Sequence, residues 1–236
     1  MFPEALINSP LFGIGLTVIV YAISEIIVDR LRLSVIPPIL LACPVIIAVI
    51  VFCPSVEYEH YAAGADFINF LLGPATIALA LPLYNNRAVI VQNAAAIISS
   101  ITLATVVAII AIYVCAKGLG ASDQVLLSLL PKSVTTPIAI EVSKTIGGIP
   151  ALTTAAVIFT GILGATFNHK LLAVFGIKSD LAAGLAIGAS SHGIGTSACA
   201  AVSAMQLAIG GVAIALTGIA TSIFAPLLLP LLQSVW

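Results

Sequence analysis

The chain has 236 residues, of which 61% are hydrophobic and only 7% are charged, and its mean hydropathy is +1.25. Soluble domains carry about 25% charged residues, so this composition excludes an ordinary soluble domain and indicates a surface that faces lipid. The net charge of −1 offers no basic surface to nucleic acid, and no nucleic-acid partner is expected. We therefore expect a single integral membrane domain over residues 1–236.

Six stretches are long and apolar enough to cross a bilayer, which takes about 20 residues. They cover residues 6–28, 34–52, 67–84, 88–114, 149–167 and 205–232. The third is interrupted by Gly73, Pro74 and Pro82, residue types that weaken or break a helix. We predict an all-α polytopic membrane protein in which residues 1–118 form a scaffold. The acidic segment 57–66 is expected to be a solvated outer loop.

Two further segments are long enough to cross but have a polar break at the centre: residues 122–144 and 181–204. The breaks read PKSVTTP (131–137) and SSHGIGTS (190–197). The residues expected to interrupt the helices are Pro131, Pro137, Gly193 and Gly195. Irregular backbone at membrane depth is tolerated only inside protein or beside a wet cavity. We therefore predict that the two breaks face each other across a small polar cavity.

The two broken segments also resemble each other. KSVTTPIAIEVS (132–143) aligns with HGIGTSACAAVS (192–203), and FTGILGATF (159–167) aligns with LTGIATSIF (216–224). We predict a duplicated unit, residues 122–176 and 180–236. If the broken segments are re-entrant hairpins, more Lys and Arg residues lie on the cytoplasmic side than if both segments cross, which favours hairpins. The two units are then inverted, as in many secondary transporters.

Lys132 is the strongest candidate for a binding residue. A lysine at membrane depth costs about 2.5–3.5 kcal/mol on insertion scales, so it is usually functional or paired. In a functional role its ammonium would hold a carboxylate. In the structural alternative it pairs with Glu141, or it reaches the interface from a shallow hairpin tip.

The other candidates are polar residues of the two breaks, which would donate hydrogen bonds to the same substrate or cap short helices. They are Ser133, Thr135, Thr136, Ser190, Ser191, His192, Thr196 and Ser197. His192 could also carry a coupled proton, or it could be a buried histidine bonded to a backbone carbonyl. Ser191 and His192 are neighbours, but adjacency does not make a nucleophile and its base. No enzyme, metal or cofactor is predicted, because GxSxG and HExxH motifs are absent from the sequence.

At these motifs the sequence resembles the LrgB/CidB family. The similar stretches are LLGPATIALALPLY (71–84), LLPKSVTTPIA (129–139), GGIPALTTAAVIFTGILGA (147–165), GLAIGASSHGIGT (184–196) and TSIFAPLL (221–228). The resemblance implies a bacterial inner-membrane protein, often encoded beside a small, holin-like LrgA/CidA partner. Such proteins are tied to control of murein hydrolases and cell lysis, and relatives are linked to pyruvate uptake or to glycolate and glycerate exchange.

The sequence departs from this family's pattern after the second break. Where the family commonly reads Ala-Arg-x-x-Glu, this chain has Ser197 and Ala198, with Ala201 in the acidic position. Gln206 is a further candidate for a replaced acid.

Taken together, these patterns predict a multi-pass secondary transporter of small monocarboxylates in the bacterial cytoplasmic membrane. The alternative is a holin- or antiholin-like regulator of murein hydrolases. The expected partners are lipid, a small anionic metabolite, an LrgA/CidA-like protein and further copies of the chain.

Overall fold

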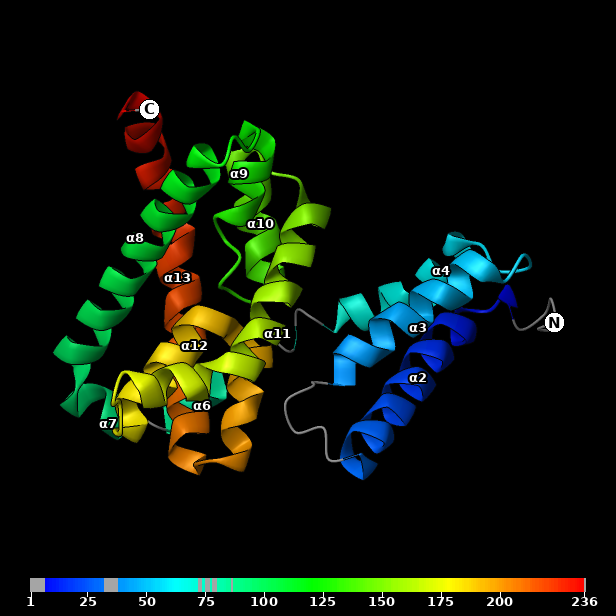
Figure 1. Cartoon of the computed structure of the whole chain (residues 1–236), viewed down its shortest axis with the longest axis horizontal. Helices are drawn as coiled ribbons and strands as arrows, with labels where there is room; N and C mark the ends of the chain where they lie inside the picture. Colours follow the sequence, from blue (N-terminus) through cyan, green and yellow to red (C-terminus); the bar gives the residue numbers. More distant parts are fainter. Residues whose placement is uncertain are drawn as a thin grey trace. The chain divides into compact units, whose positions relative to one another are not determined.

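The computed structural model describes residues 7–31, 38–71, 74, 77, 80–85 and 87–235. Every regular element in these residues is a helix, which confirms the all-α prediction. The chain divides into two compact units, Met1–Ile77 and Ala78–Trp236, which are described separately (Figure 1).

The first unit contains α2 (Pro10–Arg30), α3 (Pro38–Phe52) and α4 (Tyr58–Phe70). The helices α2 and α4 pack with their backbones close together, since a Cβ added to Gly13 or Gly64 would meet backbone atoms of the other helix. The prediction that 57–66 forms a loop is wrong, although most of its residues are exposed or half-buried. A capping box between Glu57 and His60 starts α4 there, and Gly64 lets the helix dock against α2.

The second unit contains the remaining helices in chain order. They are α6 (Ala80–Asn85), α7 (Arg87–Gln92), α8 (Ala94–Gly118), α9 (Asp123–Leu129), α10 (Thr136–Ile146), α11 (Pro150–Val174), α12 (Asp180–Ser197), the 3₁₀ helix η1 (Ala198–Ala201) and α13 (Ala204–Val235). In Figure 1, α9 and α10 lie toward the C-terminal end of α13, while α12 lies with α6 and α7 toward its other end. Each predicted broken segment therefore occupies its own end of α13.

Among the residues that the structure describes, four helices are long and apolar enough to cross a membrane: α2, α8, α11 and α13. They correspond to four of the six predicted stretches. The second stretch forms α3, whose 15 residues fall short of the usual span length. In the third stretch Gly73 lies outside the described residues, Pro74 is helical, and Pro82 belongs to α6. The count of six spans is thus not reached by these criteria.

Two apolar clusters hold the broken segments in place. In one, Ile109 and Tyr113 of α8 pack with Leu126 of α9, Val142 of α10 and Leu229 of α13. The other cluster joins the beginnings of α8 and α13 to α12 and is made of Ile97, Ile101, Leu185, Ile209 and Ala213. As a result, the first broken segment packs on the later halves of α8 and α13, and the second packs on their first halves.

The contact between α12 and α13 is made by small residues. A Cβ added to Gly184 would lie 2.7 Å from the Gln206 carbonyl oxygen, and one added to Gly188 would meet the backbone of Gly210. Close approach through glycine is a common way for membrane helices to associate. This contact holds α12 against α13, and the second break lies in α12.

Candidate functional site

The first break is a short run of turns between α9 and α10. The Lys132 amide donates to the Leu129 carbonyl at 3.1 Å, and the Val134 amide donates to the Pro131 carbonyl at 3.2 Å. Thr135 has the extended conformation of a helix N-cap, and Pro137 follows in the first turn of α10, where a missing amide hydrogen costs nothing. The predicted interruption of the helix therefore occurs at PKSVTTP.

The second break is concentrated in one residue. His192 has φ 44° and ψ −147°, and it is the only non-glycine with positive φ in the described part of the chain. Such a conformation is costly for a residue with a side chain and persists only where the surroundings hold it. Neither glycine supplies the bend: Gly195 packs against the Ser191 side chain, and Gly193 has open space around it.

His192 belongs to α12, and its ring is held against α11. Its ring is buried, and Nε2 lies 2.8 Å from the carbonyl oxygen of Val157, while its own carbonyl accepts from Thr196 Oγ1 at 2.6 Å. A Cβ added to Gly161 of α11 would lie 2.7 Å from the His192 ring. The structure thus supplies the backbone partner considered in the structural alternative, although this carbonyl comes from α11 and not from the break.

The serines before His192 form a short hydrogen-bonded chain with α11. Asn168 Nδ2 donates to Ser191 Oγ at 2.8 Å, and the Ser190 and Ser191 hydroxyls lie 2.9 Å apart. Ser191 is buried, whereas Ser190 is exposed. Asn168 was not singled out from the sequence. The signal available was an amide immediately after a predicted apolar stretch.

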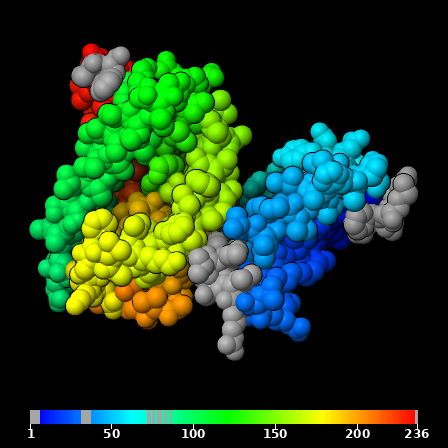
Figure 2. Space-filling model, in the orientation of Figure 1, coloured from blue at the N-terminus to red at the C-terminus, as the bar shows by residue number. Residues whose placement is uncertain are grey.

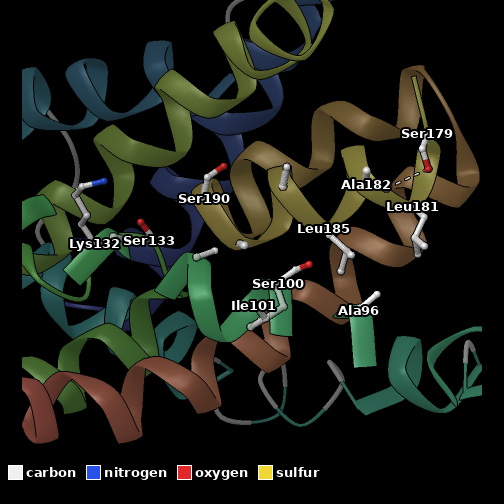
Figure 3. Close-up of a pocket in the computed structure, with 14 residues that line it drawn as sticks. Ala96, Ser100, Ile101, Lys132, Ser133, Ser179, Leu181, Ala182, Leu185 and Ser190 are labelled. Atoms are coloured by element: carbon white, nitrogen blue, oxygen red, sulfur yellow. Dashed lines mark hydrogen bonds between the residues drawn. The ribbon is translucent and has the colours of Figure 1, made fainter. Parts of the chain in front are cut away.

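One large hollow opens between α8 and the beginning of α12, and we call it the α8 hollow. Its volume is about 640 Å³. It is lined by Ala96, Ser100, Ile101, Ala104, Ala108, Lys132, Ser133, Ser179, Leu181, Ala182, Leu185, Ala186, Ala189 and Ser190. In Figure 2 the second unit is hollowed between α8 (green) and the beginning of α12 (yellow). Figure 3 shows Lys132 and Ser133 at one end, Ser179 at the other and Ser190 between them.

A second hollow of about 800 Å³ runs along α11, and we call it the α11 hollow. It is lined by Leu129, Lys132, Leu152, Ala155, Ala156, Phe159, Thr160, Leu163, Gly164, Phe167, Asn168, Leu171, Ser190 and Ser191. Lys132 and Ser190 belong to the lining of both hollows. The two predicted breaks therefore come together at the wall that the hollows share.

Lys132 is half-buried and has no ion-pair partner among the described residues. The proposed pairing with Glu141 does not form, because Glu141 bonds instead to Lys144 at 2.8 Å on an exposed face of α10. A positive charge without an acid beside it is available to bind an anion.

Not every predicted residue lies at this wall. Thr196, Ser197 and Gly193 line a separate pocket with α6 and α13, and the Ser197 hydroxyl donates to the Ile194 carbonyl at 2.7 Å. Thr135 and Thr136 line neither hollow. Thr135 Oγ1 is buried and has no hydrogen-bond partner in the part of the chain that the structure describes.

A polar cluster joins α11, α12 and α13 at the beginning of the second broken segment. Asp180 accepts from Gln206 Nε2 at 2.8 Å and from Ser203 Oγ at 2.7 Å, and the Gln206 amide oxygen lies 3.2 Å from His169 Nε2. These hydrogen bonds, first from Gln206 and then from Ser203, hold the pKa of Asp180 below its ordinary value. Gln206, the candidate for a replaced acid, acts here as a donor to an acid.

The fold and the site together define a helical membrane protein in which two interrupted helices meet at a lysine that has no ion-pair partner within the described ranges. The model of the LrgB-like family matches residues 17–231, nearly the whole chain, and the protein belongs to that family. Membership fits a membrane protein of the holin/antiholin-like or transporter-like kind. No solved structure matches the chain.

Proposed function

We propose that this protein is a secondary carrier of small monocarboxylates such as pyruvate, glycolate or glycerate. The observation that carries the proposal is the position of Lys132. Its ammonium has no acidic partner among the described residues, and with Ser190 it lies on the wall shared by the α8 and α11 hollows. A ligand bound there is in reach of both cavities.

The chemistry around Lys132 suits one carboxylate on a small molecule. The ammonium supplies one positive charge, and the hydroxyls of Ser133, Ser190 and Ser191 supply donors beside it. A single bound carboxylate neutralises the lysine, so that neither charge remains alone in an apolar environment. The hollows are within the range of about 300–1,000 Å³ typical of small-molecule sites, and alanines make up much of the α8 hollow.

An inverted repeat would account for the arrangement of the two breaks. Gly161 and Gly218 occupy equivalent places in the aligned sequences, and each lies against the broken segment of the other unit. A Cβ on Gly161 would meet His192, and a Cβ on Gly218 would lie 2.6 Å from Ile138 Cδ1. The ends of α13 at which the broken segments lie in Figure 1 support two hairpins entering from opposite sides.

In this proposal the protein is multi-pass, resides in the bacterial cytoplasmic membrane and works without a cofactor or catalytic step. Further copies of the chain and an LrgA/CidA-like protein are its proposed partners. Large apolar side chains exposed on α2, α8 and α11 are available to lipid or to these partners; Val18, Leu103 and Phe159 are examples.

Reconstitution in liposomes tests the proposal against its alternative. Uptake of labelled pyruvate, glycolate or glycerate that saturates with concentration, with a trapped dye retained, is the expected result. Uptake should be lost in Lys132→Ala and kept in Lys170→Ala, which removes an exposed lysine near the end of α11. Dye leakage at high protein density without saturable uptake would instead favour the holin-like alternative.

A further inference from the structure

A very small cavity lies behind the α8 hollow, between α8, α13 and the first break. Its volume is about 20 Å³. It is lined by Ala104, Thr105, Ala108, Ile109, Leu130, Pro131, Ser133, Ala189, Thr217 and Thr221, and we call it the threonine recess. The function proposed above makes no use of it.

The recess contains two hydroxyls that the fold leaves without a partner. Thr105 and Thr217 are 4% and 3% exposed, and within the described residues neither Oγ1 atom makes a hydrogen bond. Threonines in helices commonly donate to the carbonyl four residues earlier, as Thr154 does here to Pro150 at 2.9 Å. Buried polar groups are nearly always hydrogen-bonded, so a small polar occupant of the recess would supply the partner that the described residues do not.

The size and charge of the recess limit what the partner can be. A cavity of this volume holds one water-sized group and cannot hold a carboxylate. No acidic side chain lines the recess, and Ser133 on its wall is adjacent to the positive Lys132, so a cation is disfavoured. A single neutral oxygen that can donate or accept a hydrogen bond fits both limits.

The recess adjoins the α8 hollow, with which it shares part of its lining. Ser133, Ala104, Ala108 and Ala189 line both the recess and the α8 hollow, which also contains Lys132. In the proposal made below, a short ligand whose carboxylate contacts Lys132 places its other end against this shared lining. The three alanines leave room there for a two- or three-carbon chain.

We propose that the threonine recess is the subsite for the 2-hydroxyl or 2-keto oxygen of the substrate, with Thr105 and Thr217 as its specificity-determining residues. This inference rests on the proposed carrier function and adds to it the residues that would recognise the oxygen beside the carboxylate, which pyruvate, glycolate and glycerate have in common. A water molecule fills the recess in the empty carrier. An acid that lacks the oxygen leaves two buried hydroxyls unpaired, and sites of this kind reject such analogues strongly.

The test compares pairs of acids that differ only in this oxygen: glycolate with acetate, and lactate with propionate. Affinities are measured by calorimetry on the purified protein and uptake in liposomes. The wild type should prefer the hydroxy acid by at least about tenfold. The double variant Thr105→Val/Thr217→Val keeps the shape of the recess and removes both hydroxyls. It should bind the two acids of each pair with about equal affinity, and acetate should bind as it does to the wild type.

Two controls show that the hydroxyls and not the packing are responsible. Thr105→Ser keeps a hydroxyl and should keep the preference for glycolate. Thr154→Val removes a hydroxyl that bonds within its own helix and should leave both affinities unchanged. If the double variant does not fold, Thr217→Val is tested alone. The ratio of the affinities for glycolate and acetate should then fall about halfway to one on a logarithmic scale.

The outcomes separate this inference from the carrier function. Equal affinity of the wild type for glycolate and acetate, or an unchanged preference in the valine variants, overturns the subsite and leaves a recess for water only. If Lys132→Ala still removes binding of both acids in that case, the carrier function stands. Absence of any monocarboxylate binding by the wild type overturns both.

Discussion

Lys132 carries a charge that is expensive in an apolar setting, and no acid in the described part of the chain pairs with it to offset that cost. We predict that Lys132→Ala weakens binding of glycolate or pyruvate by about tenfold to a few hundredfold, since a charge-assisted hydrogen bond contributes about 1.5–3 kcal/mol. Lys132→Arg should also weaken binding, because a planar guanidinium does not replace a compact ammonium in a closely packed site. Calorimetry on the purified variants measures both changes.

The control for this prediction is Lys170→Ala, which should bind like the parent. A folded Lys132→Ala variant with unchanged affinity would make Lys132 a structural residue and move the binding site elsewhere.

His192 keeps its unusual backbone conformation because glycine on α11 makes room for its ring. We predict that Gly161→Ala lowers the free energy of unfolding by about 1–3 kcal/mol, the usual cost of overpacking. The new Cβ would lie 2.7 Å from His192 Cε1 and 2.8 Å from Ile194 Cβ, and the bond to Val157 prevents the ring from moving away. Thermal denaturation in detergent measures the loss.

Gly193→Ala is the matched control for Gly161→Ala. Gly193 adjoins His192, yet a Cβ there meets nothing within 4 Å and its φ is not positive. The substitution should be neutral or slightly stabilising, since alanine favours helix. Equal losses in the two variants would mean that close packing around His192 is not the cause.

At the scale of elements, Asp180 links the beginning of α12 to the beginning of α13. Because hydrogen bonds lower its pKa in the folded protein, Asp180 stabilises the fold above the ordinary aspartate pKa of 3.8. This contribution disappears as the pH falls through 3.8 to the lower folded value. We predict that the wild type loses stability as the pH falls from the ordinary aspartate pKa toward the lower folded value, and that Asp180→Asn is less stable at pH 7 but loses less over that window.

Denaturation measured at several pH values tests this prediction. The control is Asp123→Asn, which removes an acid from an exposed pair with Lys117 and should keep the pH dependence of the wild type. Parallel pH profiles for the wild type and Asp180→Asn would contradict the assigned role.

The elements that could be predicted from the sequence are those whose location follows from composition alone. Uninterrupted apolar runs gave α8, α11 and α13, and the prolines marked the first break. The second break was located by its glycines, but the bend occurs at His192, because packing against Gly161 and the Val157 carbonyl decides which residue is bent. Segment 57–66 looked like a loop from its charges, and contact between Gly13 and Gly64 overrides that local signal.

At the scale of the whole molecule, the site joins residues that no local pattern connects. Lys132, Ser190 and Ser191 were predicted from their unusual polarity in an apolar chain. Asn168 and Thr105 were not, because one amide or hydroxyl in a helix is ordinary until its neighbours are known. Sequence therefore identified the two breaks, and packing selected which of their polar residues face the shared wall.

The course of the whole chain through the bilayer gives the last prediction. If α9 and α10 form a re-entrant hairpin, positions 123 and 144 lie on the same side of the membrane. If the segment crosses, they lie on opposite sides. Figure 1 places both helices toward one end of α13, so we predict that Asp123→Cys and Lys144→Cys are labelled from the outside, and Lys178→Cys from the cytoplasm.

Impermeant maleimide labelling of intact cells and inverted vesicles tests this topology. The background variant lacks the native cysteines, Cys43, Cys53, Cys115 and Cys199. The side chains of Asp123 and Lys144 are 75% and 55% exposed, so cysteines at these positions should react readily from the side that they face. Labelling of positions 123 and 144 from opposite sides would mean that the first broken segment crosses the bilayer. The inverted repeat, which requires an odd number of crossings in each unit, would then have to be abandoned.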